Sequence, residues 1–516
     1  MSRIGRFAGA LAMAAACLGP GLSLGPAYAQ QSKDNLRIAL NEFVSGINPY
    51  DLTLDELSRV YRKVYRTLIS RDERNGTWVP ELAKSWRMVD NETLEFELRD
   101  DVTFHSGNKF TPADVIYTVN YAADPQSKIP GKARFSFLKS AEQTGPNTVR
   151  IHTNGVVGTA LESIAYDFYI LDSKVHAALP DKSAYGRVSA SGAGIYKVVK
   201  MDPRGNTLLE RFDGFVGDRN YHRAPVKNIE LIPMPERQTQ IAQMLVQGVD
   251  VLRNVEPETA AYFVNNPEIE MTTVPSGSFL YLLLDAAGRS GVPAMKDQRV
   301  RQAIAMAIDR AGIAHNLVTG ADKEKLPDAI CFPTTVACSV SRPPYGYDPA
   351  AAKKLLADAG YGEGLTLPFF VHAPYKQIGE AIAQQLQKVG IRTTIQLLPI
   401  SVYTKKRGDG ELTMFLGTRP TATYPEATAV FTSLFGGSRD YAKDPIIDAA
   451  VAKAEKTVDI AERAKILQPA IDRVNEQVYI LPISTMPTVL LHGRNVKVQP
   501  GILSMHDAEI SDFSWK

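Results

Sequence analysis

Residues 78–115 read WVPELAKSWRMVDNETLEFELRDDVTFHSGNKFTPADV, and this stretch carries most of the information about the fold. Polar and apolar residues alternate over residues 93–98, which is the period of a strand with one buried face. A helix start follows at Thr111, Pro112 and Asp114: the threonine supplies the N-cap oxygen, the proline takes the first helical position and the aspartate caps back. The stretch therefore predicts a strand and a helix joined by a turn.

The rest of the chain repeats this alternation of strands and helices. Residues 237–247 predict an amphipathic helix that Gly248 ends, and residues 367–371, 378–389 and 391–398 predict strand, helix and strand in turn. No internal repeat or low-complexity linker divides the chain, and 516 residues are too many for one core. We expect a mixed α/β (α+β) fold with helices packed on sheets, in two or three domains built from interleaved segments.

The first 29 residues have the pattern of a secretory signal peptide. Arg3 and Arg6 give a positive start, residues 7–18 are apolar, and Ala27 and Ala29 are the small residues that a signal peptidase reads. A membrane-spanning helix is the alternative, but the apolar run falls short of the ~20 residues that a bilayer requires. We predict removal of residues 1–29 and a periplasmic location.

The charge of the chain belongs to this signal segment. The formal net charge is +2, and residues 1–29 contain two arginines and no acid, so the remaining chain is neutral. A neutral chain with interspersed charges offers no basic face to nucleic acid, and no later segment is long and apolar enough to span a membrane. We therefore expect an exported, soluble protein that does not bind nucleic acid.

The three cysteines agree with export. Cys17 lies in the signal segment, where lipid anchoring is a less favoured alternative because the leucine of a lipobox is missing. Cys331 and Cys338 are close enough for a disulfide that closes a small surface loop in an oxidising compartment. Free thiols are the alternative, and a metal site lacks further ligands nearby.

Motifs of common enzyme classes are missing from the sequence. There is no serine in a Gly-x-Ser-x-Gly elbow, no His-Glu-x-x-His, and no glycine-rich phosphate loop followed by Lys-Ser or Lys-Thr. The eight histidines are scattered, with no two at metal-ligand spacing. We expect no catalytic residue, no metal and no cofactor.

Further motifs run through nearly the whole chain in a fixed order. Besides residues 78–115 they are VYRTL at 64–68, QGVD at 247–250, VRQAIAMAIDR at 300–310, KKLLADAGY at 353–361 and YILP at 479–482. Together they resemble the extracellular solute-binding proteins of family 5, the large binding proteins of peptide, opine and nickel importers. Most of these residues are of types that build cores, turns and helix surfaces, so they identify a family without marking its ligand site.

The resemblance implies a type II periplasmic binding protein with two ligand lobes, a hinge and an extra domain. The expected first lobe comprises residues 30–78, 192–275 and 483–516; the extension domain spans 79–191 and the second lobe 276–482. In such proteins the ligand shifts an open–closed equilibrium, and an inner-membrane ABC permease with its ATPases receives the closed complex. The resemblance thus implies a monomeric importer component.

The family's peptide anchor has changed in this chain. Family peptide binders pair an aspartate, after a tryptophan-containing strand, with the peptide's α-ammonium; alignment on Tyr424 puts Pro420 at the tryptophan and Thr423 at the aspartate. A hydroxyl gives an ammonium no charge-assisted partner, so ordinary peptide binding here is in doubt. Arg419 can instead hold a carboxylate or phosphate in a bidentate grip, with a salt bridge to a neighbouring acid as the alternative. Thr421 of the same loop is a further candidate contact.

The resemblance also implies candidate contacts on both lobes. Tyr403 falls where family members place an aromatic side chain against the ligand, and Arg407, one helical turn later, is a second candidate anion contact. Tyr281 lies on a strand near the domain crossover, where a core position is the alternative. The candidates at the first strand-to-loop corner of the other lobe are Phe43, Ser45 and Gly46.

The lost aspartate and the nearby arginine predict a ligand with an anionic group, such as an opine or a modified peptide. An oligosaccharide is the next alternative, because 21 tyrosines are available for stacking on sugars. A nickel chelate is less favoured, since the candidate loop has no histidine. A binding protein coupled to a sensor and an exported hydrolase are the remaining alternatives.

Overall fold

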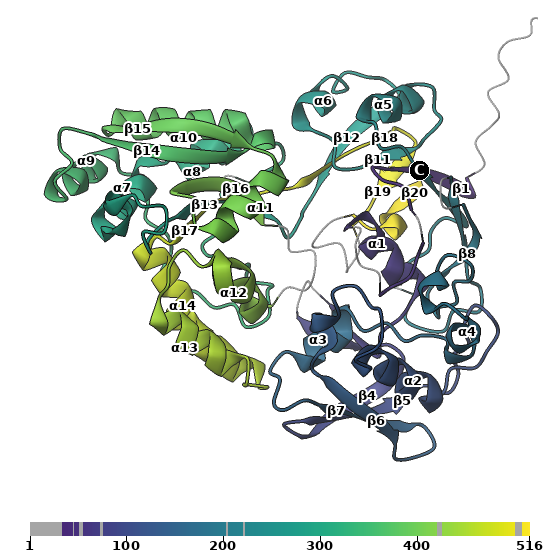
Figure 1. The fold of residues 1–516 in the computed structure, drawn as a ribbon. Coiled ribbons are helices and arrows are strands. Elements are labelled where there is room, and N and C mark those ends of the chain that lie inside the picture. Colours follow the sequence, from purple (N-terminus) through teal and green to yellow (C-terminus); the bar gives the residue numbers. More distant parts are fainter. Residues whose placement is uncertain are drawn as a thin grey trace, which may run out of the picture.

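The computed structural model describes residues 33–44, 46–50, 55–72, 76–202, 205–219, 222–322, 324–419, 426–500 and 508–516. Within these ranges the fold is mixed α/β, as predicted, with three main sheets (Figure 1). The predicted strand at 93–98 and the predicted helix after Thr111 are both confirmed.

A seven-stranded sheet is built from segments far apart in sequence. Its central strand β1 (Asn35–Leu40) runs parallel to β10 and β11, while the outer strands pair antiparallel. In spatial order the other strands are β12 (Ile269–Val274), β18 (Thr488–Gly493), β11 (Val251–Leu252), then, beyond β1, β10 (Asn228–Pro233), β9 (Thr207–Arg211) and β8 (Tyr196–Met201). The helices α5 (Arg237–Leu245) and α6 (Pro257–Ala261) cover its β11–β12 end.

A four-stranded antiparallel sheet follows the first strand of this unit in sequence. Its strands are, in spatial order, β4 (Ala83–Asp90), β5 (Thr93–Leu98), β7 (Thr148–Thr153) and β6 (Leu138–Gln143). Helix α2 (Pro112–Ala123) packs on it and begins with a capping box, in which Thr111 N donates to the Asp114 carboxylate over 2.8 Å. The seven- and four-stranded units share one continuous hydrophobic core, so from here on "first lobe" means both units together and includes the expected extension domain.

The second lobe is built on a five-stranded sheet. Its strands are, in spatial order, β15 (Ile391–Leu398), β14 (Leu365–His372), β16 (Met414–Arg419), β13 (Phe279–Leu284) and β17 (Ile480–Thr485). One face packs on α7 (Gln298–Ala307), α8 (Arg310–Leu317), α9 (Pro349–Asp358) and α10 (Lys376–Lys388), and the other on α11 (Ile400–Asp409), α12 (Ala427–Phe435), α13 (Pro445–Ala454) and α14 (Ile460–Gln477). Every residue of β13 is therefore buried, as expected for a strand covered on both faces.

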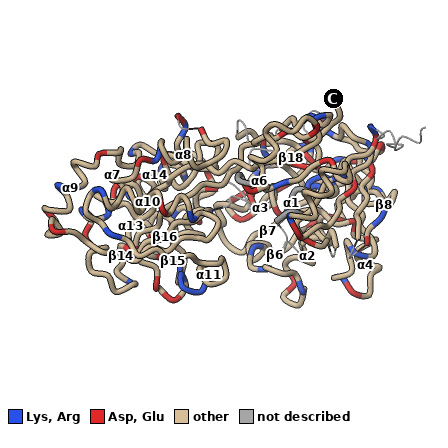
Figure 2. The backbone as a smooth tube through the Cα atoms, turned by 90° about the horizontal axis from the view of Figure 1, so that it is seen from above, with Lys and Arg blue, Asp and Glu red and all other residues tan. Residues whose placement is uncertain are grey.

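Smaller elements complete the described chain. They are α1 (Asp55–Val64), β2 (Ile69–Asp72), β3 (Thr77–Pro80), α3 (Ala160–Tyr166), α4 (Ser173–Ala178), β19 (Val496–Val498), β20 (Phe513–Trp515) and 3-10 turns at Lys132–Phe135, Lys182–Ala184, Pro293–Lys296, Ala373–Tyr375, Gly437–Arg439 and Ile510–Asp512. Acidic and basic residues are interspersed over both lobes (Figure 2).

Two chain segments cross between the lobes, from β12 to β13 and from β17 to β18 (Figure 1). They lie side by side, because Met486 N donates to Ser278 O over 3.0 Å and the Ser276 hydroxyl donates to Met486 O. Two short paired connections of this kind form a natural hinge for lobe movement.

Candidate functional site

Three of the predicted ligand residues meet inside the second lobe. The Tyr281 and Tyr403 hydroxyls are 3.1 Å apart, and Arg407 Nη1 donates to the Tyr403 hydroxyl over 2.9 Å. Phe415 of β16 stacks on the Tyr403 ring, with 3.9 Å between ring centroids and 11° between planes. Burial in this aromatic cluster raises the pKa of Tyr403, so its hydroxyl stays protonated and can donate or accept a hydrogen bond.

Arg407 brings a buried positive charge to this cluster. Its side chain belongs to a residue that is only 7% exposed, and Nη2 donates to Leu434 O over 2.8 Å. Its Nε is buried without a hydrogen-bond partner, and no carboxylate in the described part of the chain pairs with the guanidinium. A buried cation without a counter-charge is costly, which makes this arginine a candidate for a role other than stability.

Arg419 lies at the end of β16, opposite Phe279 of β13. Its Nε donates to the Ser433 hydroxyl of α12 over 3.0 Å, and among the described residues no carboxylate forms the salt bridge considered as the alternative. Burial lowers the pKa of the Arg419 guanidinium to about 10, while the Tyr281 hydroxyl opposes this shift. The guanidinium remains charged at neutral pH and retains donors for an anion.

Thr421 and Thr423 lie outside the described residues, as does Ser45. The loop of residues 420–425 is bracketed by Arg419 and by Glu426, the N-cap of α12. Both brackets are fixed: Arg419 by Ser433, and Glu426 by Ala429 N, which donates to its carboxylate over 2.9 Å. The described residues on both sides of this segment, Arg419 and Glu426, are thus tied to α12.

The first lobe contributes an exposed aromatic ring and a closely packed glycine. Phe43 is 54% exposed, so its ring is accessible to solvent. Gly46 is buried, and a Cβ there would lie 2.5 Å from Arg187 Cγ. The corner after β1 therefore offers an apolar ring on a tightly packed turn.

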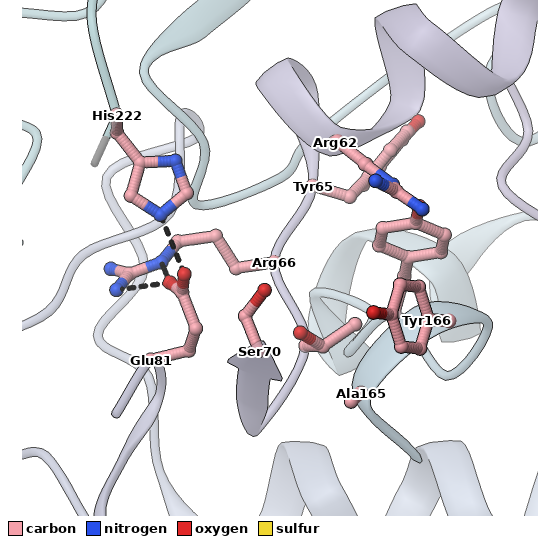
Figure 3. A pocket seen from close by; sticks show the side chains of 10 residues that line it. Arg62, Tyr65, Arg66, Ser70, Glu81, Ala165, Tyr166 and His222 are labelled. Carbon is pink, nitrogen blue, oxygen red and sulfur yellow. Dashed lines mark hydrogen bonds and ion pairs between the residues drawn. The ribbon is translucent and has the colours of Figure 1, made fainter. Parts of the chain in front are cut away.

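The pocket in Figure 3 shows a charged cluster that was not predicted as a site. Glu81 accepts from Arg66 Nε over 2.7 Å and contacts His222 Nε2 over 2.6 Å, all three being buried. Burial alone would raise the pKa of Glu81, but His222 and Arg66 outweigh it and lower the pKa to about 2. Arg66 and Glu81 occur in two of the family-like motifs, so the cluster explains these motif residues as internal bracing.

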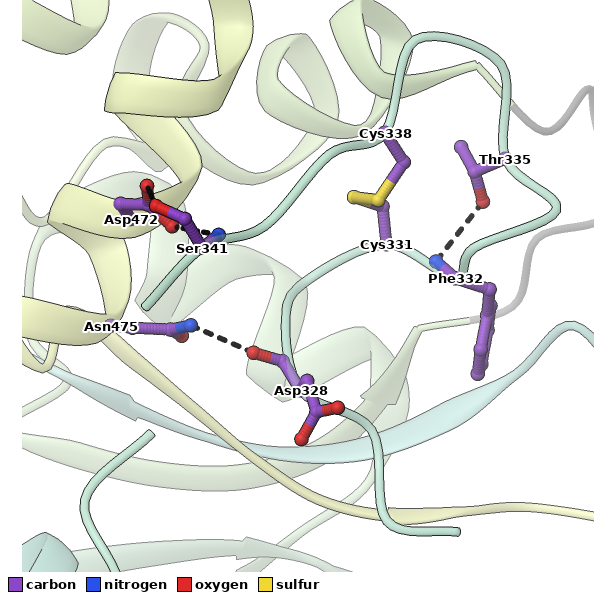
Figure 4. Close-up of a disulfide and its surroundings, with 8 residues drawn as sticks. All are labelled: Asp328, Cys331, Phe332, Thr335, Cys338, Ser341, Asp472 and Asn475. Atoms are coloured by element: carbon purple, nitrogen blue, oxygen red, sulfur yellow. Dashed lines mark hydrogen bonds between the residues drawn. A yellow bond between two sulfur atoms is a disulfide. The ribbon is translucent and has the colours of Figure 1, made fainter. Parts of the chain in front are cut away.

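The structure joins Cys331 and Cys338 in a disulfide (Figure 4). The loop that it closes lies beside the N-terminus of α12, where Ala427 N donates to Val336 O over 2.9 Å. Asn475 of α14 donates to Asp328 O over 2.7 Å, just ahead of the loop. The disulfide loop thus supports the point at which the predicted ligand loop enters α12.

No group of three or more histidine, cysteine, aspartate or glutamate side chains in the described ranges could hold a metal ion. No helix in the same ranges has the length and apolarity needed to cross a membrane.

Comparisons with known proteins agree with the family that the motifs indicated. The model of the bacterial extracellular solute-binding proteins, family 5 Middle, matches residues 77–442. Heme-binding protein A of Haemophilus influenzae is 25% identical over 388 residues, covering 68% of each chain, and glutathione-binding protein GsiB of Pectobacterium atrosepticum is 22% identical, covering 92% of this chain and 94% of its own. The structure of the ABC transporter substrate binding protein CtaP of Listeria monocytogenes has a TM-score of 0.79 at 20% identity, covering 93% of this chain and 99% of its own.

Proposed function

Because this chain belongs to the bacterial extracellular solute-binding proteins of family 5, we propose that it captures a small organic solute between its lobes and delivers it to an ABC permease. The proposed location is the periplasm after removal of residues 1–29, and the proposed active form is a monomer. The proposed domains are 30–78 with 192–275 and 483–516, 79–191, and 276–482. Relatives across the family are binding proteins, and we assign no catalytic residue.

We further propose that the solute carries an anionic group, which Arg419 binds with Arg407 as second cation. The observation that supports this is a pair of guanidiniums beside the Tyr281 and Tyr403 hydroxyls without a carboxylate partner among the described residues. An arriving carboxylate or phosphate would supply the missing counter-charge and accept bidentate hydrogen bonds.

The rest of the proposed site suits a peptide-like solute. Thr421 and Thr423 supply hydroxyls in place of the family's anchoring aspartate, so the solute's charge recognition moves from its ammonium to its anion. On the first lobe, Phe43 offers apolar contact, and the backbone around Ser45 and Gly46 offers hydrogen bonds to an amide. The GsiB relatives are named for glutathione, a modified peptide with free carboxylates, and this name supports the same class.

The proposal is tested by a thermal-shift screen of the protein without residues 1–29. The panel contains glutathione, opines, dipeptides and tripeptides, oligosaccharides, heme and a nickel–histidine chelate. A solute at a hundred times its dissociation constant stabilises the folded state by about 2.7 kcal/mol, which raises the melting temperature measurably. We expect shifts with the anionic, peptide-like solutes; shifts restricted to neutral sugars or to the nickel chelate would contradict the proposed ligand class.

A further inference from the structure

The lobes meet at a second place, far from the hinge segments. There the loop before α3 of the four-stranded unit contacts the turn between α13 and α14 of the second lobe (Figure 1). Gly158 N donates to Glu455 O over 2.7 Å, and a Cβ at Gly158 would lie 2.5 Å from Thr457 O. The two backbones therefore approach as closely as a glycine allows.

A charged triad lies within this contact. Arg463 of α14 is fully buried; its Nε donates to Glu426 over 3.1 Å, and its Nη2 donates to Glu162 of α3. Arg463 Nη1 donates to Gly158 O, across the same contact. Glu162 and Glu426 are both buried, so the triad joins the lobes without help from solvent.

A buried triad of charges is weak evidence that this contact serves to stabilise the fold. Taking three charges out of water costs free energy that the ion pairs only partly return, and apolar residues would serve as well in a permanent contact. The Arg463–Glu426 pair lies within the second lobe, whereas Glu162 reaches it from the first. The contact between the lobes thus depends on the pairing of Arg463 with Glu162 across it.

The triad is also linked to the proposed anion site through α12. Glu426 caps the N-terminus of this helix, and Ser433 of the same helix accepts from Arg419. A rigid helix thus has the triad at its start and the proposed anion contact at its other end.

We propose that Glu162, Arg463 and Glu426 form an interlobe clasp, which holds the lobes together opposite the hinge and sets how readily the cleft opens. The clasp acts on the arrangement of the two lobes, and none of its residues is proposed to contact the ligand. It is independent of the ligand's identity.

The clasp strengthens as the pH falls. Burial and the charge of Glu162 raise the pKa of Glu426 to about 7, against the opposing effect of Arg463, and burial raises the pKa of Glu162, against Arg463 and Arg71. Separating the lobes removes the repulsion between the carboxylates, so the clasped form binds protons more tightly. Acidification through pH 7 therefore favours the clasped arrangement.

The test measures the distribution of distances between the two lobes by double electron–electron resonance between spin labels. Spin labels are placed at K139C on the four-stranded unit and at K388C on the second lobe, in the protein without residues 1–29. Both positions are exposed, and Cys331 and Cys338 are bonded to each other. Samples without added ligand are measured at pH 8 and pH 6, as the label pair alone, with E162A, and with E142A as an exposed control on the same unit.

We expect E162A, which removes the acceptor for Arg463 on the first lobe, to shift the distribution to longer distances at both pH values, while E142A matches the unsubstituted pair. We also expect the unsubstituted pair to shift to shorter distances at pH 6, and this arm needs no substitution in the clasp. Identical distributions for E162A and the unsubstituted pair, or a pH response of the opposite sign, would overturn the clasp.

Discussion

Removal of the disulfide between Cys331 and Cys338 should destabilise the second lobe by an amount that its loop length sets. The bond closes a loop with a sequence separation of 7 residues. Around it, Phe332 packs against Phe279 and Ala427 N donates to Val336 O, so the loop is part of the lobe's core contacts. The suitable variant is C331A/C338A, because serine would bury a hydroxyl at Cys331, which is 6% exposed.

The expected loss follows from the entropy that the bond removes from the unfolded chain. Closing a loop of this length stabilises by about 2.5 kcal/mol at 25 °C in the chain-entropy model. For a unit of about 200 residues, such a loss lowers the melting temperature by roughly 5–10 °C.

Differential scanning calorimetry of the protein without residues 1–29 measures this change. Residues 30–516 contain no other cysteine, so a reductant should lower the melting temperature of the wild type and leave C331A/C338A unaffected. An unchanged melting temperature in the double variant, or a wild type that ignores reductant, would refute this reasoning about the loop.

Two further substitutions test the internal bracing. E81Q should cost about 3 kcal/mol, because it breaks a buried ion pair with Arg66 and His222. The pKa of Glu81 is lowered to about 2 in the fold, so the difference in unfolding free energy between wild type and E81Q should be complete above pH 4.5 and shrink as the pH falls toward 2. A difference that does not change with pH in urea unfolding would contradict the assignment of Glu81 as an ionised, paired carboxylate. D114A should lower the unfolding free energy by about 1–2 kcal/mol, because the buried carboxylate caps α2 and accepts from the Ser173 hydroxyl over 2.6 Å; an unchanged urea midpoint would contradict this role.

Local structure was the part of the fold that the sequence could predict. The helix start at Thr111 is encoded by neighbouring residues, because the Asp114 carboxylate caps back to Thr111 N over 2.8 Å. The predicted helix at 237–247 is shorter in the structure, ending at Leu245, because helix ends depend on packing as well as on sequence. Fold class followed from the alternation of these elements.

Contacts between distant charges could not be predicted in this way. Periodicity shows which face of a helix is buried, but Arg463 and Glu162 are 301 residues apart and nothing local pairs them. The contact between Tyr281 and Tyr403, which are 122 residues apart, could not be predicted from local patterns either. Both residues were predicted as ligand contacts because the chain resembles a known family. The assignment of these residues to the ligand stays a prediction.

The claim that the solute's anion is held by Arg419 is tested most directly by calorimetric titration in a double-mutant cycle. The tightest-binding solute of the screen and its carboxamide analogue are titrated into wild type, R419A and R392A, an arginine control on the exposed part of β15. We predict that the carboxamide binds wild type and R392A about 10–100-fold more weakly than the acid, as for loss of one charge-assisted contact. R419A should bind the acid more weakly and discriminate it from the amide by less than wild type does, with Arg407 providing what remains. If R419A discriminates acid from amide as well as wild type does, the anion is held elsewhere and the proposed site is wrong.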